Sequence, residues 1–192
     1  MSYPVPDIFP ELDSIIDTHA HYVSEQYENL HNEIFSQFEA FGVKAVINCG
    51  CNIENSKKTI ELAKKYDCCY AAVGFHPEDI TDEGIDLVAL EELLKAEKVL
   101  AIGEIGLDYY WNKENKAVQI NAFIAQIELA KKYDLPVIVH DRDAHADTLK
   151  ILKRYKPKGV VHCFSGSVEM AREIIKLGMY IGLGGAVTFK NA

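Results

Sequence analysis

Long hydrophobic runs are absent from this sequence. No uninterrupted apolar stretch reaches the roughly 20 residues that a membrane-spanning helix needs. Residues 1–7 also lack the basic flank and the apolar core of a secretory leader. We therefore expect a cytoplasmic protein without a membrane partner.

Positive charge is in short supply. The 192 residues include 20 Lys and Arg against 29 Asp and Glu, which gives a formal net charge of -9. This balance argues against a protein that adheres to nucleic acid or to anionic membranes regardless of sequence. It leaves room for a phosphate substrate held by metal ions, because bound cations can be the largest local charges in a site.

Paired cysteines are lacking too. The five cysteines show no C-x-x-C spacing, which fits a reducing, cytosolic setting. A zinc site built from Cys49 and Cys51 is less favoured than reduced thiols that behave as small hydrophobes. With 48% apolar and 26% charged residues, the composition argues against disorder and suits one globular domain over residues 1–192.

Apolar runs alternate with helical patterns after an irregular lead-in over residues 1–13. The runs lack polar alternation, which indicates parallel strands buried on both faces. Strands are expected at 14–18, 43–49, 69–74, 99–103, 136–139, 159–161 and 179–183. Helices are expected at 25–41, 53–66, 87–96, 118–133, 144–155 and 168–177. Expected N-caps are Asp143 and Ser167, and expected helix stops are Gly42 and Gly178.

Seven strands alternating with helices fit either an open doubly wound sheet or a barrel. An open sheet binds its ligand at one switch point, whereas a barrel gathers all strand ends around one site. Candidate ligands follow five of the expected strands, which only a barrel would bring together. We therefore predict an α/β fold of the (β/α)8 TIM-barrel type, here with about seven parallel strands.

The first candidate ligands are His19 and His21, at the end of the first expected strand. Side chains in an extended chain alternate between two faces, so both imidazoles point the same way and can chelate one metal ion. Taken alone, the pair reads equally well as two surface histidines. Later strands that also end in His or Glu favour the metal site.

Three further candidates are Glu104, His140 and His162. Glu104 lies between Gly103 and Gly106, where packing explains a carboxylate poorly, and it could bridge two cations. The two histidines each end a valine-rich strand. Together with His19 and His21 they provide one bridging carboxylate and two imidazoles for each of two ions, an arrangement suited to hydrolytic displacement.

Three residues have weaker signals, and their alternatives stay open. His76 could contact substrate or cap a turn. Asp108 could orient a metal ligand, contact substrate or cap a turn. Arg142 could bind a phosphate through its guanidinium or pair with Asp141 or Asp143 on the surface.

The chain resembles the TatD family of metal-dependent deoxyribonucleases, within the amidohydrolase-like barrel superfamily. The resemblance spans nearly the whole chain in family order. It rests on the stretches IIDTHAH, VGFHP, AIGEIGLDYYW, the run from Gln119 through Phe123 and Gln126 to Ala130, LPVIVHDRDA, GVVHCFSG and GGAVTFKNA.

The resemblance implies a barrel that holds two divalent ions (Mg²⁺, Mn²⁺ or Zn²⁺). It implies hydrolysis of DNA phosphodiester bonds, with single strands or DNA ends shortened from the 3′ side, and metal-ligand roles for the candidates at strand ends. It also implies an active-site role for His76. Competing hypotheses are a barrel hydrolase that cleaves amides, lactones or small esters, and an inactive fragment that only binds metal.

The resemblance also implies a further helix and an eighth strand with an acidic end, which this sequence does not contain. We therefore expect an incomplete barrel, lacking about one βα unit and with reduced or no activity. A fragment, a frameshifted gene and a protomer completed by another chain all remain open. We expect a monomer that could associate through the open barrel edge.

Overall fold

Seven strands form one parallel sheet in a computed structural model that describes residues 14–111 and 113–190. Each strand pairs with its neighbours along the chain, so the order is β1 to β7. The expected lead-in over residues 1–13 lies outside the described residues. The strands are β1 (Ile15–Ala20), β2 (Val43–Cys49), β3 (Cys69–Val73), β4 (Val99–Asp108), β5 (Val137–Arg142), β6 (Gly159–Val161) and β7 (Tyr180–Ile181).

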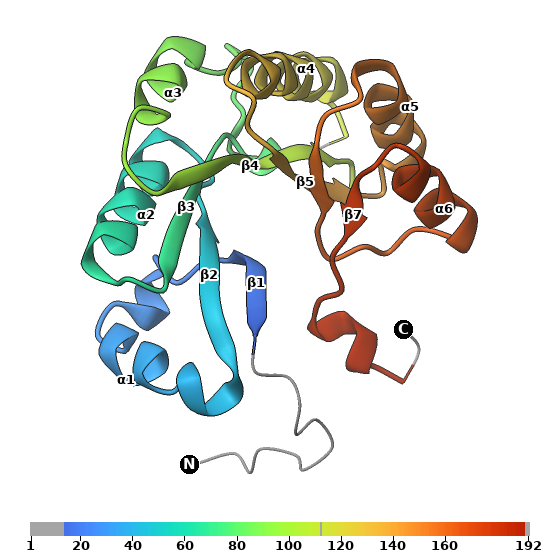
Figure 1. The fold of residues 1–192 in the computed structure, drawn as a ribbon. Coiled ribbons are helices and arrows are strands. Elements are labelled where there is room, and N and C mark those ends of the chain that lie inside the picture. Colours follow the sequence, from blue (N-terminus) through green and yellow to red (C-terminus); the bar gives the residue numbers. More distant parts are fainter. Residues whose placement is uncertain (1–13, 112, 191–192) are drawn as a thin grey trace.

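The sheet curls, and the helices lie around its outer side (Figure 1). The α-helices are α1 (His31–Ser36), α2 (Ile53–Lys65), α3 (Leu87–Leu93), α4 (Lys116–Lys132), α5 (His145–Tyr155) and α6 (Val168–Lys176). The short 3-10 helices are η1 (Glu25–Tyr27), η2 (Glu39–Phe41), η3 (Pro77–Asp79) and η4 (Gly185–Thr188). This arrangement confirms the predicted barrel type. It is a half-barrel in which, among the described residues, β1 and β7 each pair on one side only.

The core has two layers because strand side chains alternate between the faces of the sheet. The larger layer lies between strands and helices and includes Phe123 and Ile127 of α4. The smaller layer lies on the other face of the sheet and consists of Cys49, Ala72, Ala101 and Ile138. Mostly small side chains on this inner face are what a curled sheet with a narrow interior can accommodate.

The structure differs from the prediction in one helix and in the lengths of several strands. The single helix expected at 25–41 is wrong: the segment forms η1, α1 and η2. Its Asn, Ser and aromatic residues are weak helix formers, and its rings are held by packing. Phe35 contacts Tyr22 and Tyr66, with ring centroids 5.3 and 4.7 Å apart.

The second difference concerns the ends of β4 and β5. Both strands run further than expected, so Glu104 and His140 lie within strands rather than after them. The expected strand at 179–183 shortens to the two residues of β7.

The predicted helix boundaries hold at most positions. Ser167 accepts a hydrogen bond from the Met170 N–H, and Gly42 and Gly178 have positive φ of 70° and 80° after their helices. Asp143 is not the cap of α5, because it has a left-handed φ of 55° and the cap position falls on Ala144.

No described helix combines the length and the apolar character needed to cross a bilayer. A cytoplasmic location stays a prediction. The single sheet agrees with our proposal that the chain forms one domain.

Gly159, at the start of β6, should tolerate no side chain. Its φ is +141°, and a Cβ there would lie 2.0 Å from the Val137 carbonyl oxygen. We expect Gly159→Ala to lower the free energy of unfolding by about 2–4 kcal/mol, measured by urea denaturation. In the matched control Gly185→Ala, the added Cβ has no neighbour within 4 Å, and a change below about 0.5 kcal/mol is expected. Equal denaturation midpoints for both variants would contradict this account of the β5–β6 contact.

Candidate metal centre

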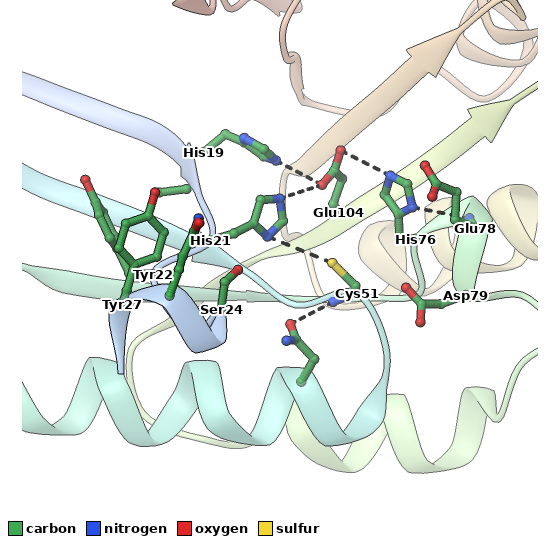
Figure 2. Close-up of a pocket in the computed structure, with 13 residues that line it drawn as sticks. His19, His21, Tyr22, Ser24, Tyr27, Cys51, His76, Glu78, Asp79 and Glu104 are labelled. Carbon is green, nitrogen blue, oxygen red and sulfur yellow. Dashed lines mark hydrogen bonds and ion pairs between the residues drawn. The ribbon is translucent and has the colours of Figure 1, made fainter. Parts of the chain in front are cut away.

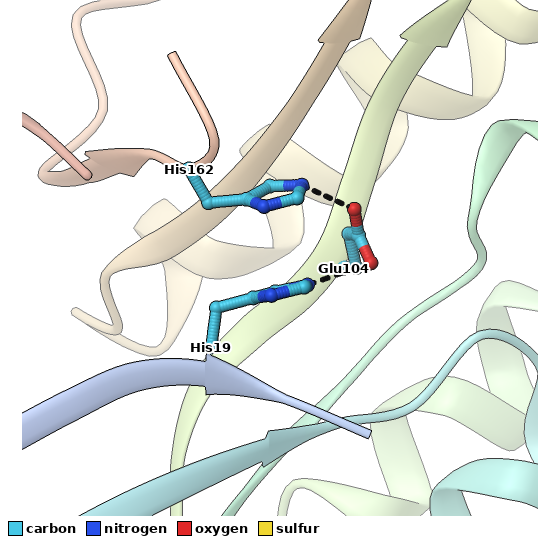
Figure 3. A group of neighbouring side chains, drawn as sticks. All are labelled: His19, Glu104 and His162. Carbon is cyan, nitrogen blue, oxygen red and sulfur yellow. Dashed lines mark hydrogen bonds and ion pairs between the residues drawn. The ribbon is translucent and has the colours of Figure 1, made fainter. Parts of the chain in front are cut away.

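Glu104 lies at the centre of the residues that the sequence singled out. It is 2% exposed and sits in β4 where the register against β5 shifts between Ile102 and Ile105. Its N–H donates to the Gly50 carbonyl oxygen, 2.9 Å away, across the curl of the sheet. The side chain therefore points into the half-barrel, toward residues from strands at both sides (Figure 3).

One oxygen of this carboxylate faces the histidine pair of β1. Glu104 Oε2 lies 2.9 Å from His19 Nε2 and 3.1 Å from His21 Nε2. The two imidazoles share a face because they are two residues apart in extended chain, as predicted. Asn48 of β2 fixes the turn that follows, since its buried side-chain oxygen accepts the Tyr22 N–H at 2.9 Å.

The other oxygen faces histidines of the later strands. Glu104 Oε1 lies 2.9 Å from His140 Nδ1 and 3.6 Å from His76 Nε2, and it is in closer contact with His162 Nε2. His162 follows β6, and its N–H donates to the Val139 carbonyl oxygen at 3.0 Å. The structure thus brings all five predicted ligands together, and His76 with them.

The ring nitrogens of His21 and His140 show that the cluster needs positive charge. Cys49 contributes a carbonyl oxygen 3.1 Å from His21 Nδ1, and because a carbonyl only accepts, that nitrogen donates. The opposite nitrogen, Nε2, faces a carboxylate. His140 lies between two carboxylates, with Nδ1 at Glu104 and Nε2 3.0 Å from Asp108 Oδ2. Each contact requires a proton or a metal cation between nitrogen and oxygen.

Protonation of the histidines alone would not stabilise this cluster. His19 and His162 are stacked with ring centroids 3.8 Å apart, so two positive imidazoles there would repel each other. His162 Nδ1 is buried without a hydrogen-bond partner among the described residues. Divalent cations would satisfy neutral imidazoles and the carboxylate together, so the donor set fits a metal centre.

The pKa directions follow from burial and from these contacts. Burial opposes ionisation of Glu104, but hydrogen bonds from His140, His162 and the β1 pair outweigh it and hold its pKa well below the usual range. Burial lowers the pKa of His162. For His21, contacts with Cys51 and Glu104 outweigh burial and raise the pKa to about 10. The centre therefore combines a carboxylate with a lowered pKa and imidazoles whose pKa values are shifted in opposite directions.

Three groups of side chains have donor atoms close enough to share an ion. Within each group the donor atoms lie within 4.8 Å of one another, and Glu104 belongs to all three. The groups are His19, Glu104 and His162; His21, Cys51 and Glu104; and His76, Glu104 and His140. Because Glu104 belongs to every group, its carboxylate could bridge two ions.

Cys51 was missed as a candidate for this centre. Its Sγ lies 3.9 Å from His21 Nδ1, and its position just beyond β2 places it on the same rim as the histidines. The sequence signal was available, because Cys51 follows a buried strand as His76 follows β3. The sequence pattern suggested Cys51 only as a partner of Cys49, which is buried within β2.

His76 caps a turn, which is one of the two roles that its sequence context left open. Its Nδ1 accepts the Glu78 N–H at 3.2 Å and so caps η3. Nε2 therefore carries the hydrogen and faces Glu104. His76 is thus arranged to donate a hydrogen bond within the centre.

Asp108 combines two roles. It is fully buried, and Oδ1 accepts the N–H groups of Tyr110 and Trp111 at 2.9 and 3.0 Å. Oδ2 contacts His140. Burial opposes its ionisation, but the Trp111 N–H and His140 outweigh burial and lower the pKa of the carboxyl. This geometry favours a residue that positions His140 and caps a turn over one that touches substrate.

Two glutamines of α4 support the centre from outside the sheet. Gln126 pairs with both backbone groups of Phe75, receiving the N–H at 2.8 Å and donating to the carbonyl oxygen at 3.2 Å. Gln119 does the same for Asp108, at 2.9 and 3.0 Å. Both side chains are fully buried. Polar residues on the buried face of an otherwise apolar helix were the sequence signal for this brace.

A pocket of about 670 Å³ opens onto the centre (Figure 2). It is lined by His19, His21, His76 and Glu104, together with residues that follow β1, β2 and β3. A substrate entering this pocket meets the carboxylate and its histidines at the pocket floor.

Relatives that match nearly the whole of this chain are named as metal-dependent hydrolases, and the chain belongs to this class of protein. More narrowly, it belongs to the TatD related DNase family, whose sequence pattern matches residues 16–192. The resemblance found in the sequence is thereby confirmed.

Three relatives illustrate the match. The chain is 44% identical to the uncharacterized metal-dependent hydrolase YabD of Bacillus subtilis, over 93% of this chain and 71% of that protein. It is 36% identical to a 3′-5′ ssDNA/RNA exonuclease TatD of Cronobacter sakazakii, over 85% of this chain and 64% of that protein. The crystal structure of the TatD homolog YjjV from Escherichia coli superimposes with a TM-score of 0.86 at 36% identity, covering 93% of this chain and 71% of that one.

Removing the Gln126 brace should destabilise the fold. In Gln126→Leu the Phe75 N–H and carbonyl oxygen lose their buried partners, and we expect the free energy of unfolding to fall by about 1–3 kcal/mol. The control Glu128→Leu places the same side chain at an exposed position of α4. It should change the free energy of unfolding by less than about 0.5 kcal/mol. Urea denaturation followed by circular dichroism measures both. A Gln126→Leu variant as stable as the control would show that the hydrogen bonds are dispensable.

Proposed function

We propose that this hydrolase cleaves phosphodiester bonds of nucleic acid, shortening single-stranded DNA from its 3′ end, with two divalent ions bound. One observation supports the proposal above others: the single carboxylate of Glu104 presents each of its oxygens to a different set of imidazoles. Two ions held in this way several ångströms apart suit an in-line displacement at phosphorus.

Each side chain has a distinct part in this proposal. Glu104 would bridge the ions, and His19, His21, His140 and His162 would hold them. Bound divalent cations supply Lewis acidity to the phosphodiester and lower the pKa of a water molecule.

Around the ions, other residues handle the substrate. The Nε2–H of His76 is placed to donate to a phosphate oxygen in the pocket. Asp108 keeps His140 oriented, since their contact fixes which ring nitrogen faces Glu104.

The choice of nucleic acid as substrate comes from relatives, one of which is named as a 3′-5′ ssDNA/RNA exonuclease. The donor set leaves the metal open: imidazole and carboxylate suit Mn²⁺ and Zn²⁺, and the nearby Cys51 thiol suits the softer Zn²⁺. Titration with Mg²⁺, Mn²⁺ and Zn²⁺ identifies the preferred ion.

Glu104→Gln should abolish the centre while keeping the shape of the side chain. We expect wild-type protein to bind about two Mn²⁺ or Zn²⁺ ions by calorimetry, and the variant at most one. Nuclease activity should fall at least about 100-fold. Glu128→Gln makes the same change at an exposed position and should alter neither property. Full activity in Glu104→Gln would falsify the assignment.

Substrate tests separate the nuclease from a small-molecule hydrolase. A 5′-fluorescein-labelled single strand with added Mn²⁺ should be shortened stepwise, and a strand blocked at its 3′ end should resist. Chelation by EDTA should stop the reaction, and added metal should restore it. If only amides, lactones or small esters are hydrolysed, the nuclease proposal is wrong. If no ion binds in calorimetry, the metal-centre assignment fails as well.

A further inference from the structure

Two adjacent aromatic side chains are exposed beside the metal centre. Tyr110 and Trp111 follow the end of β4 and are 51% and 63% exposed. Their rings meet edge to face, with centroids 4.8 Å apart. Large aromatic side chains left in water at the rim of a site need an explanation, because burying them would be favourable.

Arg142, at the end of β5, stacks on this pair. Its guanidinium carbon lies 4.0 Å from the Tyr110 ring centroid and 5.5 Å from that of Trp111. The surface ion pair with Asp141 that the sequence left open does not form, because the Asp141 carboxylate binds Thr148 and contacts His145. No ion pair of Arg142 occurs among the described residues, so its N–H groups remain available to an anion.

The aromatic pair is fixed to the metal centre through one side chain. Asp108 Oδ1 accepts the backbone N–H groups of Tyr110 and Trp111, and Oδ2 contacts His140. Arg142 is the register partner of Asp108 across β4 and β5. The exposed rings and the guanidinium therefore keep a defined position relative to the centre.

We propose that Tyr110, Trp111 and Arg142 form a nucleotide platform that stacks a base of single-stranded nucleic acid and contacts its phosphate. The proposal rests on the proposed function and adds the part of the substrate that the protein recognises. Stacking on aromatic rings accepts any base, and an adjacent guanidinium binds the backbone. In a chain with a net charge of -9, such a local contact replaces a broad basic surface.

Trp111 is the single tryptophan of the chain, so its fluorescence reports directly on the platform. The protein is titrated in EDTA with a short oligothymidylate and with an abasic strand of equal length. We expect saturable quenching by the oligothymidylate and about tenfold weaker binding of the abasic strand, since one stacked base contributes about 1–3 kcal/mol. Equal binding and equal quenching by both strands would overturn the platform.

Variants test the same idea without tryptophan fluorescence. By anisotropy of a labelled oligothymidylate, Trp111→Leu should raise the dissociation constant about tenfold, whereas Trp111→Phe should restore most of the affinity. Arg142→Gln should weaken binding and reduce the salt dependence by about one phosphate contact. Tyr180→Leu removes an aromatic side chain of β7 that is even more exposed, and it should leave binding unchanged.

Kinetics distinguish failure of the platform from failure of the nuclease proposal. Trp111→Leu should raise KM for the oligothymidylate about tenfold with a much smaller effect on kcat, so that the KM values of the oligothymidylate and the abasic strand approach each other. If cleavage occurs but Trp111→Leu matches the wild type in KM and binding, the platform is wrong and the nuclease stands. If no strand is cleaved while base-dependent quenching persists, the nuclease proposal fails and the platform stands.

Discussion

The contact on which the rest of the site depends is the buried carboxylate of Glu104 against its ring of imidazoles. A carboxylate that is 2% exposed can keep its charge only if positive charge surrounds it. The imidazoles that provide the contacts come from strands at both sides of the sheet. The sheet must therefore curl far enough for β1 and the end of β6 to face the same oxygen pair, and the charge balance of the site and the curvature of the fold require one another.

The curvature is supported at both faces of the sheet. Small side chains such as Ala72 and Ala101 fill the inner layer, and α4 braces the outside. The buried amides of Gln119 and Gln126 reach past the strands and hold the backbone of Asp108 and Phe75. Two strand ends that carry polar residues are thus positioned by one helix, at the cost of burying two amides that are fully hydrogen-bonded.

Local patterns in the sequence were enough to predict the strands, the barrel and the group of five ligands. The period of two along β1 placed His19 and His21 on one face, and apolar runs placed the other ligands at strand ends. Packing between distant segments was not readable in this way. The helix expected at 25–41 does not form as one element, because Phe35 packs against Tyr22 and Tyr66. Cys51 follows a buried strand, which is a local signal, but its contact with His21 depends on the curl of the sheet.

Asp108 connects the metal centre to the exposed segment that carries Tyr110 and Trp111. One oxygen of its carboxylate contacts His140, and the other accepts the backbone N–H groups of the exposed Tyr110 and Trp111. A movement of the aromatic segment would therefore shift the Asp108 carboxylate and, through it, the His140 ring. The pocket reaches Glu104 from the side of β1 to β3, whereas the aromatic segment lies beyond β4 and β5. On the proposed platform, a strand whose base stacks on the rings would extend its backbone toward Glu104 and end in the pocket. Asp108 would then connect the platform to the metal centre through its contacts with His140 and with the backbone of Tyr110 and Trp111.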